Sequence, residues 1–92
     1  MTFEWDEKKN LENIKKHNVS FEVAQGAFFD TNRIIILDEK HSKIEERFFC
    51  ITNDGHGIIT VRFTIRNGSI RIFGAGYWRE GKDIYEQEHS LH

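Results

Sequence analysis

Arginines and aromatic residues alternate near the end of the chain, in a spacing suited to binding a polyanion. VRFTIR (residues 61–66) and SIRIFGAGY (69–77) flank Asn67-Gly68, the residue pair that favours a tight type I′ hairpin turn. A hairpin through this turn pairs Arg66 with Ser69 and, further along, Arg62 with Phe73. One face then carries Arg62, Thr64, Arg66, Arg71, Phe73 and Tyr77, and the opposite, core-facing side carries Val61, Phe63, Ile65, Ile70 and Ile72.

The arginine-bearing face combines two properties that single-stranded RNA requires of a protein surface. Guanidinium groups bind phosphates, and aromatic rings stack on bases. The segment from residue 55 to 79 contains no acidic residue, so these arginines lack a counter-charge on their own strands. We therefore expect Arg62, Phe73 and Tyr77 to contact RNA. The alternative is polar packing on the solvent-exposed side of an antiparallel sheet.

Two histidines lie among residues that could transfer protons or hold a phosphate. His17 follows two lysines at the end of a predicted helix, and His41 begins a stretch that continues with Ser42, Glu45, Glu46 and Arg47. Imidazole and carboxylate groups act as general acids and bases, while cations stabilise charge on a phosphoryl group. Each set also has a simpler interpretation, namely helix capping for His17 and a solvated loop for the residues around His41. No histidine pair has the i, i+4 spacing of a helical metal site, so neither a metal nor a cofactor is predicted.

The segment GYWREGKD (76–83) has the glycine and lysine spacing of a phosphate-binding P-loop. Asp83, however, occupies the position where that loop places Ser or Thr on magnesium. The strands predicted here also lie upstream of the segment, in hairpins. We therefore interpret the match as chance and attribute Gly74 and Gly76 to a bend or a close backbone approach where the last strand ends.

Two helices are predicted in the first third of the chain. The first spans about residues 7–17, follows Asp6 as its N-cap, and carries only Leu11 and Ile14 as a thin apolar stripe. The second follows Ser20, and its apolar residues recur with the period of a helix packed on a sheet: Phe21, Ala24 and Phe28. Both helices are expected on the core-facing side of the sheet.

Strands are predicted on both sides of these helices. FEW (3–5) reads as an edge strand, and RIIIL (33–37) is continuously apolar, as in a strand covered on both faces. RFFCIT (47–52) leads into the hairpin, and a helix over about residues 78–88 follows it. We therefore predict an α+β fold, in which an N-terminal strand and two helices pack on one face of an antiparallel sheet with a C-terminal helix.

Length and composition set further bounds on the class of protein. The 92 residues, 38% of them hydrophobic, suffice for one domain spanning residues 1–92. The formal net charge of −2 argues against general binding to duplex DNA, so any nucleic-acid contact must come from the locally basic segment. A single cysteine, Cys50, excludes an internal disulfide, and the sequence shows neither an export signal nor a membrane span. A cytoplasmic protein is expected.

Four motifs resemble those of the BrnT family of type II toxin–antitoxin toxins. They are FEWDEKK (3–9), NIKKHNVSF (13–21), DEKHSKIEER (38–47) and FTIRNGSIRI (63–72), and the likeness runs over about residues 3–86. The resemblance implies a fold similar to RelE-type ribonucleases and a toxin that cleaves RNA and inhibits translation. It also implies a BrnA-type antitoxin as partner, which would supply the contact to DNA, in a hetero-oligomer; a homodimer is the other assembly considered.

The resemblance also implies where the site residues lie. By position, the catalytic set is Lys16, His17, Glu46, Arg47, Arg66 and Arg71, with RNA contacts from Arg62, Phe73, Tyr77 and His41. Residues 74–76 read Gly-Ala-Gly where family members usually have Ser-Ala-Arg followed by a basic helix. Two functions therefore stay open: a metal-independent ribonuclease, or a weak or inactive member that serves as a protein-binding module for its antitoxin.

Overall fold

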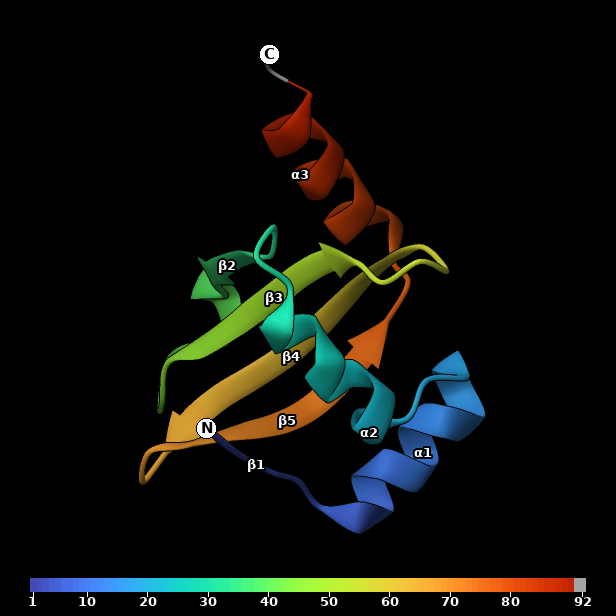
Figure 1. Cartoon of the computed structure of the whole chain (residues 1–92). Helices are drawn as coiled ribbons and strands as arrows, with labels where there is room; N and C mark the ends of the chain where they lie inside the picture. The colour runs from blue at the N-terminus through green and yellow to red at the C-terminus, as the bar shows by residue number, and fades with distance from the viewer. Residues whose placement is uncertain (91–92) are drawn as a thin grey trace.

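A five-stranded sheet carries helices on both of its faces in the structure, a computed structural model that describes residues 1–90 (Figure 1). The strands are ordered β1-β5-β4-β3-β2 across the sheet. Their bounds are β1 Thr2–Glu4, β2 Ile34–Leu37, β3 Arg47–Asn53, β4 Ile58–Arg66 and β5 Ser69–Gly76. The helices are α1 Glu7–His17, α2 Phe21–Ala24 and α3 Arg79–His89, with 3₁₀ turns η1 Gln25–Phe29 and η2 Glu39–His41.

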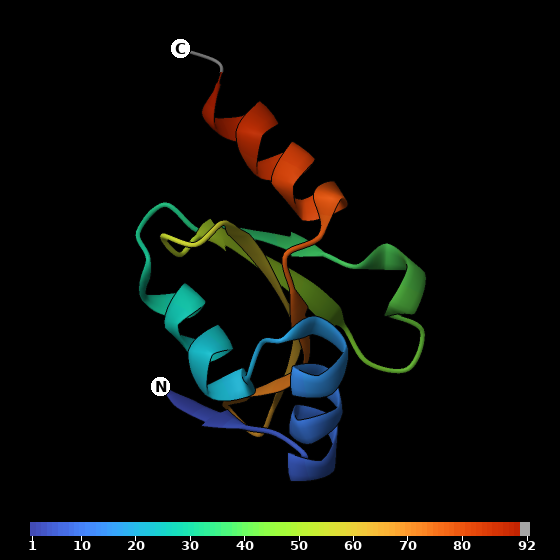
Figure 2. The same cartoon turned by 90° about the vertical axis from the view of Figure 1, so that its right-hand side faces the viewer.

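The α+β class is confirmed, with one change to the sheet. β1 runs parallel to β5, so the sheet is mixed, whereas the sequence predicted an antiparallel one. In Figure 2, α2 with η1 and the η2 segment lie on opposite sides of the strands, and α3 extends beyond the end of the sheet. Likeness to RelE-type ribonucleases stays a prediction. Within residues 1–90, no helix has the length and apolar character needed to cross a membrane.

The Asn67-Gly68 turn sets the register of the last hairpin, as predicted, over most of its length. Both turn residues have positive φ, and the pairs from Arg66–Ser69 to Phe63–Ile72 are confirmed. A β-bulge then inserts one extra residue into β5. Arg62 consequently lies opposite Gly74, and the predicted Arg62–Phe73 pair is wrong.

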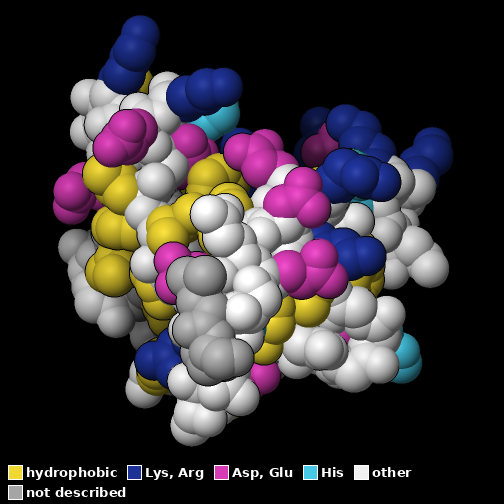
Figure 3. Space-filling view, turned by 90° about the horizontal axis from the view of Figure 1, so that it is seen from above, with side chains coloured by type: hydrophobic (Ala, Val, Ile, Leu, Met, Phe, Trp, Pro, Cys, Tyr) yellow, Lys and Arg dark blue, Asp and Glu magenta, His cyan; other side chains and the backbone are white. Residues whose placement is uncertain are grey.

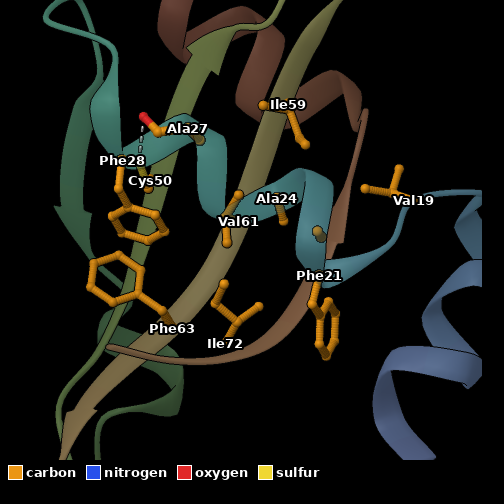
Figure 4. Close-up of a cluster of buried hydrophobic side chains, with 11 residues drawn as sticks. Val19, Phe21, Ala24, Ala27, Phe28, Cys50, Ile59, Val61, Phe63 and Ile72 are labelled. Atoms are coloured by element: carbon orange, nitrogen blue, oxygen red, sulfur yellow. Dashed lines mark hydrogen bonds between the residues drawn. The ribbon is translucent and has the colours of Figure 1, made fainter. Parts of the chain in front are cut away.

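The apolar core lies between the sheet and the α2–η1 segment (Figure 4). Phe21, Ala24 and Phe28 are buried there, as their helical period predicted. The Phe28 ring meets Phe63 of β4 edge to face, with the ring centroids 4.8 Å apart. Ile65 was predicted in this core, but it is 59% exposed. The end of the hairpin extends past the helices that cover the core. Side chains there still alternate between the two faces of the sheet, but none of the described helices covers the face at Ile65.

Cys50 lies in this core with its thiol 3.7 Å from the carbonyl oxygen of Ala27. Burial raises the pKa of the Cys50 thiol to about 12. Because the thiolate is the reactive species, Ellman's reagent at pH 7 is expected to label the folded chain at least about 10³-fold more slowly than the urea-unfolded chain. Rapid labelling without denaturant would show that η1 separates readily from the sheet.

α1 docks beside β5 through polar side chains, and the predicted apolar stripe is wrong. Leu11 and Ile14 are exposed, whereas Asn10 and Asn13 are buried. The Asn13 amide donates to the carbonyl oxygens of Ala75 and Val19, at 2.9 Å each, and accepts from the Ala75 N–H at 3.2 Å. β1 pairs with β5 only as far as Arg71. Beyond that point the Asn13 side chain satisfies the backbone of Ala75, as a neighbouring strand otherwise would. The Asp6 cap is confirmed, since its carboxylate accepts from the N–H of Lys8.

β2 forms the opposite edge of the sheet, so the prediction that residues 33–37 are covered on both faces is wrong. Ile34 and Ile36 are half-buried, while Ile35 and Leu37 are exposed. Each face of β2 is only partly covered by neighbouring elements. A continuous apolar run does not distinguish this edge position from the centre of a sheet.

α3 packs on the face opposite α2, and two glycines permit its approach. A Cβ at Gly81 would overlap Thr60 Oγ1 on β4, and a Cβ at Gly76 would lie 2.6 Å from Cε2 of Trp78. Both glycines belong to the P-loop-like segment. Their spacing therefore reflects close packing of α3 and of the end of β5.

Candidate functional site

Four of the predicted site residues meet in one cleft of about 180 Å³, termed here the first cleft. They come from the end of α1 and from the β4–β5 hairpin: Lys16, His17, Arg62 and Phe73. The cleft is completed by Lys9, Glu12, Asn13, Gly74 and Trp78. The polar docking of α1 on β5 through Asn13 is what brings the helix end beside Arg62. Residues separated by about 45 positions in the sequence thus share one site.

His17 ends α1 and faces an aromatic partner across the first cleft. Its imidazole meets the Trp78 indole edge to face, with centroids 5.2 Å apart and ring planes at 85°. Lys15 and Lys16 precede it in the last helical turn, where positive charge is favourable. Trp78 was not predicted as a site residue. A signal that could have identified it is its place two residues after Gly76, where the last strand ends.

Arg47, Arg66 and His41 meet in a second cleft, of about 540 Å³, beside the loop between β2 and β3, whereas Arg71 lines neither cleft. Its lining consists of Lys40, His41, Lys43, Ile44, Glu45, Arg47 and Arg66. This loop is held by its own hydrogen bonds. His41 Nδ1 lies 2.8 Å from the buried Asp38 carboxylate, and the Ser42 hydroxyl accepts from the Arg47 N–H while donating to the Asp38 carbonyl. These hydrogen bonds fix the path of the loop backbone, while most of its side chains, His41 among them, are exposed.

Glu45, not the predicted Glu46, supplies the carboxylate of the second cleft. It accepts two hydrogen bonds from Arg66, at 2.9 and 3.1 Å, and lies 3.7 Å from Arg47. The hydrogen bonds from Arg66 lower the pKa of Glu45. Glu46 is exposed, and its backbone carbonyl accepts from Thr64. Adjacent acidic residues could not be told apart by position alone.

Phe73 joins the two clefts. The guanidinium carbon of Arg47 lies 4.5 Å from the centroid of the Phe73 ring, and that of Arg62 lies 5.1 Å from it. Both distances are within the range of cation–π attraction. The ring therefore orients two arginines of the chain itself, whereas the sequence predicted a ring open for stacking on a base.

Two of the arginines have counter-charges after all. Arg66 pairs with Glu45, and Arg71 pairs with Glu4 of β1 at 3.4 Å. These acids come from segments that the topology brings alongside the hairpin, so the hairpin sequence alone did not reveal them. Within residues 1–90, Arg62 has no carboxylate within 4 Å. Arg62 is thus the hairpin arginine that is free to bind an anion.

Tyr77 lies apart from both clefts. Its hydroxyl donates to the Asp54 carboxylate in the β3–β4 turn. Burial, together with this hydrogen bond, raises the pKa of Tyr77 to about 12. Tyr77 lines a separate hollow with His56 and Lys82, so the structure does not bring it together with the other predicted RNA-binding residues.

Basic side chains gather in groups on the surface. Figure 3 shows Lys and Arg in two separate groups along its upper edge, with acidic side chains between them. Within the described residues, no group of three His, Cys, Asp or Glu side chains is placed to hold a metal ion. Lysines and arginines outnumber acidic residues in the lining of both clefts, which suits phosphate.

Comparison with known proteins gives this geometry a context. Residues 5–81 match the family described as the ribonuclease toxin, BrnT, of type II toxin–antitoxin systems. No individual curated protein matches the chain. The matched segment runs from the residue before the α1 cap to the first turn of α3, and it includes both clefts. The chain therefore belongs to the BrnT family of ribonuclease toxins.

Proposed function

We propose that this chain cleaves RNA in the first cleft, without a metal ion, and that a BrnA-type antitoxin neutralises it. The observation that carries the proposal is the convergence of Lys16, His17 and the unpaired Arg62 in one cleft. Family membership supports the ribonuclease class and a protein antitoxin. Cleavage of messenger RNA would inhibit translation, and contact with DNA would come through the antitoxin.

The proposed reaction is transfer of the phosphodiester to the neighbouring ribose hydroxyl. The 2′-oxygen forms a bond to phosphorus, the bond from phosphorus to the 5′-oxygen breaks, and a 2′,3′-cyclic phosphate results. A base takes the 2′-OH proton and an acid protonates the leaving oxygen. His17 and Glu12 line the same cleft and supply these two groups, either residue serving as the base and the other as the acid. Lys16 and Arg62 stabilise the charge on the phosphoryl oxygens.

The second cleft is proposed to bind the flanking phosphates. Arg47 and Arg66 line it beside His41, and Glu45, in place of the predicted Glu46, is the carboxylate that pairs with Arg66 there. The pairs Arg66–Glu45 and Arg71–Glu4 are partly exposed to solvent, and water and salt screen ion pairs that they can reach. An RNA phosphate can therefore replace the carboxylate at either arginine.

The test is cleavage of a 5′-labelled single-stranded RNA by the purified chain in EDTA, with identification of a 2′,3′-cyclic end. Arg62→Ala is expected to lower the cleavage rate by about 10²-fold, because it removes a cation aimed at the phosphoryl group. Arg66→Ala is the matched control on the same strand, and its expected loss is several-fold smaller. Circular dichroism checks that both variants fold. Equal losses would remove the first cleft as the site of reaction.

The second candidate function is that of a protein-binding module without catalytic activity. The pairing of Arg66 and Arg71 with carboxylates of their own chain favours it. This function predicts no RNA cleavage, no growth defect on expression of the chain alone, and tight binding to the antitoxin. Growth arrest that depends on Arg62 would exclude it.

A further inference from the structure

We infer that Trp78 is a positioning residue that orients the His17 imidazole in the first cleft, and that Gly76 is required to seat the Trp78 indole. The inference rests on the proposed function for its catalytic consequence. The placement of the two rings can be tested independently of cleavage. Neither Trp78 nor Gly76 was among the residues predicted for the site.

His17 has no polar group that fixes its ring. It is exposed at the end of α1, and within residues 1–90 its imidazole makes no hydrogen bond. A catalytic base ordinarily needs a third group that orients it. The contact that the structure shows for the His17 ring is the edge-to-face contact with Trp78, with centroids 5.2 Å apart.

Trp78 is itself held in place at the junction of β5 and α3. Its backbone is extended (φ −93°, ψ 146°) at the N-cap position, and its side chain makes no capping hydrogen bond. The indole instead lies against the end of β5 and forms one wall of the first cleft. The ring therefore spans the space between the sheet and the end of α1.

Gly76 is needed for its lack of a side chain, not for its backbone conformation. Its φ is not positive, since the positive-φ glycines of the described residues are Gly55 and Gly68. A Cβ at position 76 would lie 2.6, 2.7 and 3.0 Å from Cε2, Cζ2 and Nε1 of Trp78. The indole thus occupies the space that any other side chain at position 76 would need.

A double-mutant cycle on RNA cleavage tests whether Trp78 acts through His17. Trp78→Ala is expected to lower kcat by about 3- to 10-fold, the equivalent of one aromatic edge-to-face contact, with KM changed less than 2-fold. In a His17→Ala background the same change should cost nothing further. Trp78→Phe, which keeps an aromatic ring, should restore part of the loss. The inference would be overturned if Trp78→Ala lowered kcat by the same factor in the His17→Ala background as in the unaltered chain, or if it changed only KM.

The imidazole proton resonances of His17 test the placement without any RNA. They are expected to shift in Trp78→Ala and in Gly76→Ala. They should stay unchanged in Gly26→Ala, where an added Cβ meets no atom within 4 Å. Adding Gly76→Ala to Trp78→Ala should cause no additional shift. Unchanged His17 resonances in Trp78→Ala would overturn the placement even if the chain cleaves RNA, whereas absent cleavage with the expected shifts would overturn only the proposed function.

Discussion

Replacing His17 by alanine is expected to lower the rate of RNA cleavage by about 10²–10⁴-fold, the usual contribution of one general acid or base. Its stability cost should be small, because the side chain is exposed and ends a helix. The measurement is single-turnover cleavage of a labelled RNA at saturating protein, with thermal unfolding followed by circular dichroism. The combination of lost activity and retained fold would identify a chemical role.

The lysines before His17 provide a matched control. Lys16 lines the first cleft, whereas Lys15, its neighbour on the same helical turn, is absent from the lining. Lys16→Ala should therefore reduce cleavage clearly, and Lys15→Ala should stay within about 2-fold of the unaltered chain. Full activity of His17→Ala would contradict the proposal and move the acid–base role to His41 in the second cleft, which His41→Ala would then reveal.

Local patterns predicted the hairpin because its determinants are local. Asn67-Gly68 fixed the turn, and strict alternation then placed Arg62 and Phe73 on one face. The bulge at Phe73 escaped prediction because alternation assumes equal numbers of residues on the two strands. Ile65 was misplaced for a related reason: a strand pattern tells which face a residue occupies but not how far the covering helices extend.

The site was predictable only in part, because the order of the strands and the path of the loops bring its residues together from distant parts of the sequence. The parallel pairing of β1 with β5 brings Glu4 to Arg71, and the loop after β2 brings Glu45 to Arg66. Neither acid is near its arginine in the sequence. The convergence of α1 with the hairpin was hidden as well, because buried asparagines in a charged helix have the same pattern as exposed ones.

Replacing Asn13 by alanine is expected to destabilise the fold by about 3 kcal/mol. Its amide makes three hydrogen bonds, and its loss leaves the N–H and C=O of Ala75 and the C=O of Val19 without these partners in a buried position. An unsatisfied buried group costs about 1–3 kcal/mol, so even partial access of water leaves a large effect. For a chain of this length the melting temperature should fall by more than 10 °C, at roughly 4–8 °C per kcal/mol.

Leu11→Ala is the control that separates polar from apolar docking of α1. Leu11 lies on the same helix but is 60% exposed, so its loss should cost no more than about 0.5 kcal/mol. Asn13→Asp should cost at least as much as Asn13→Ala, since a buried carboxylate still accepts from the Ala75 N–H but sets a charged oxygen without a proton against both carbonyl oxygens. A cost for Asn13→Ala no larger than that for Leu11→Ala would show that other contacts hold α1. Because α1 carries Lys16 and His17 into the first cleft, its docking would then no longer explain how the site is assembled.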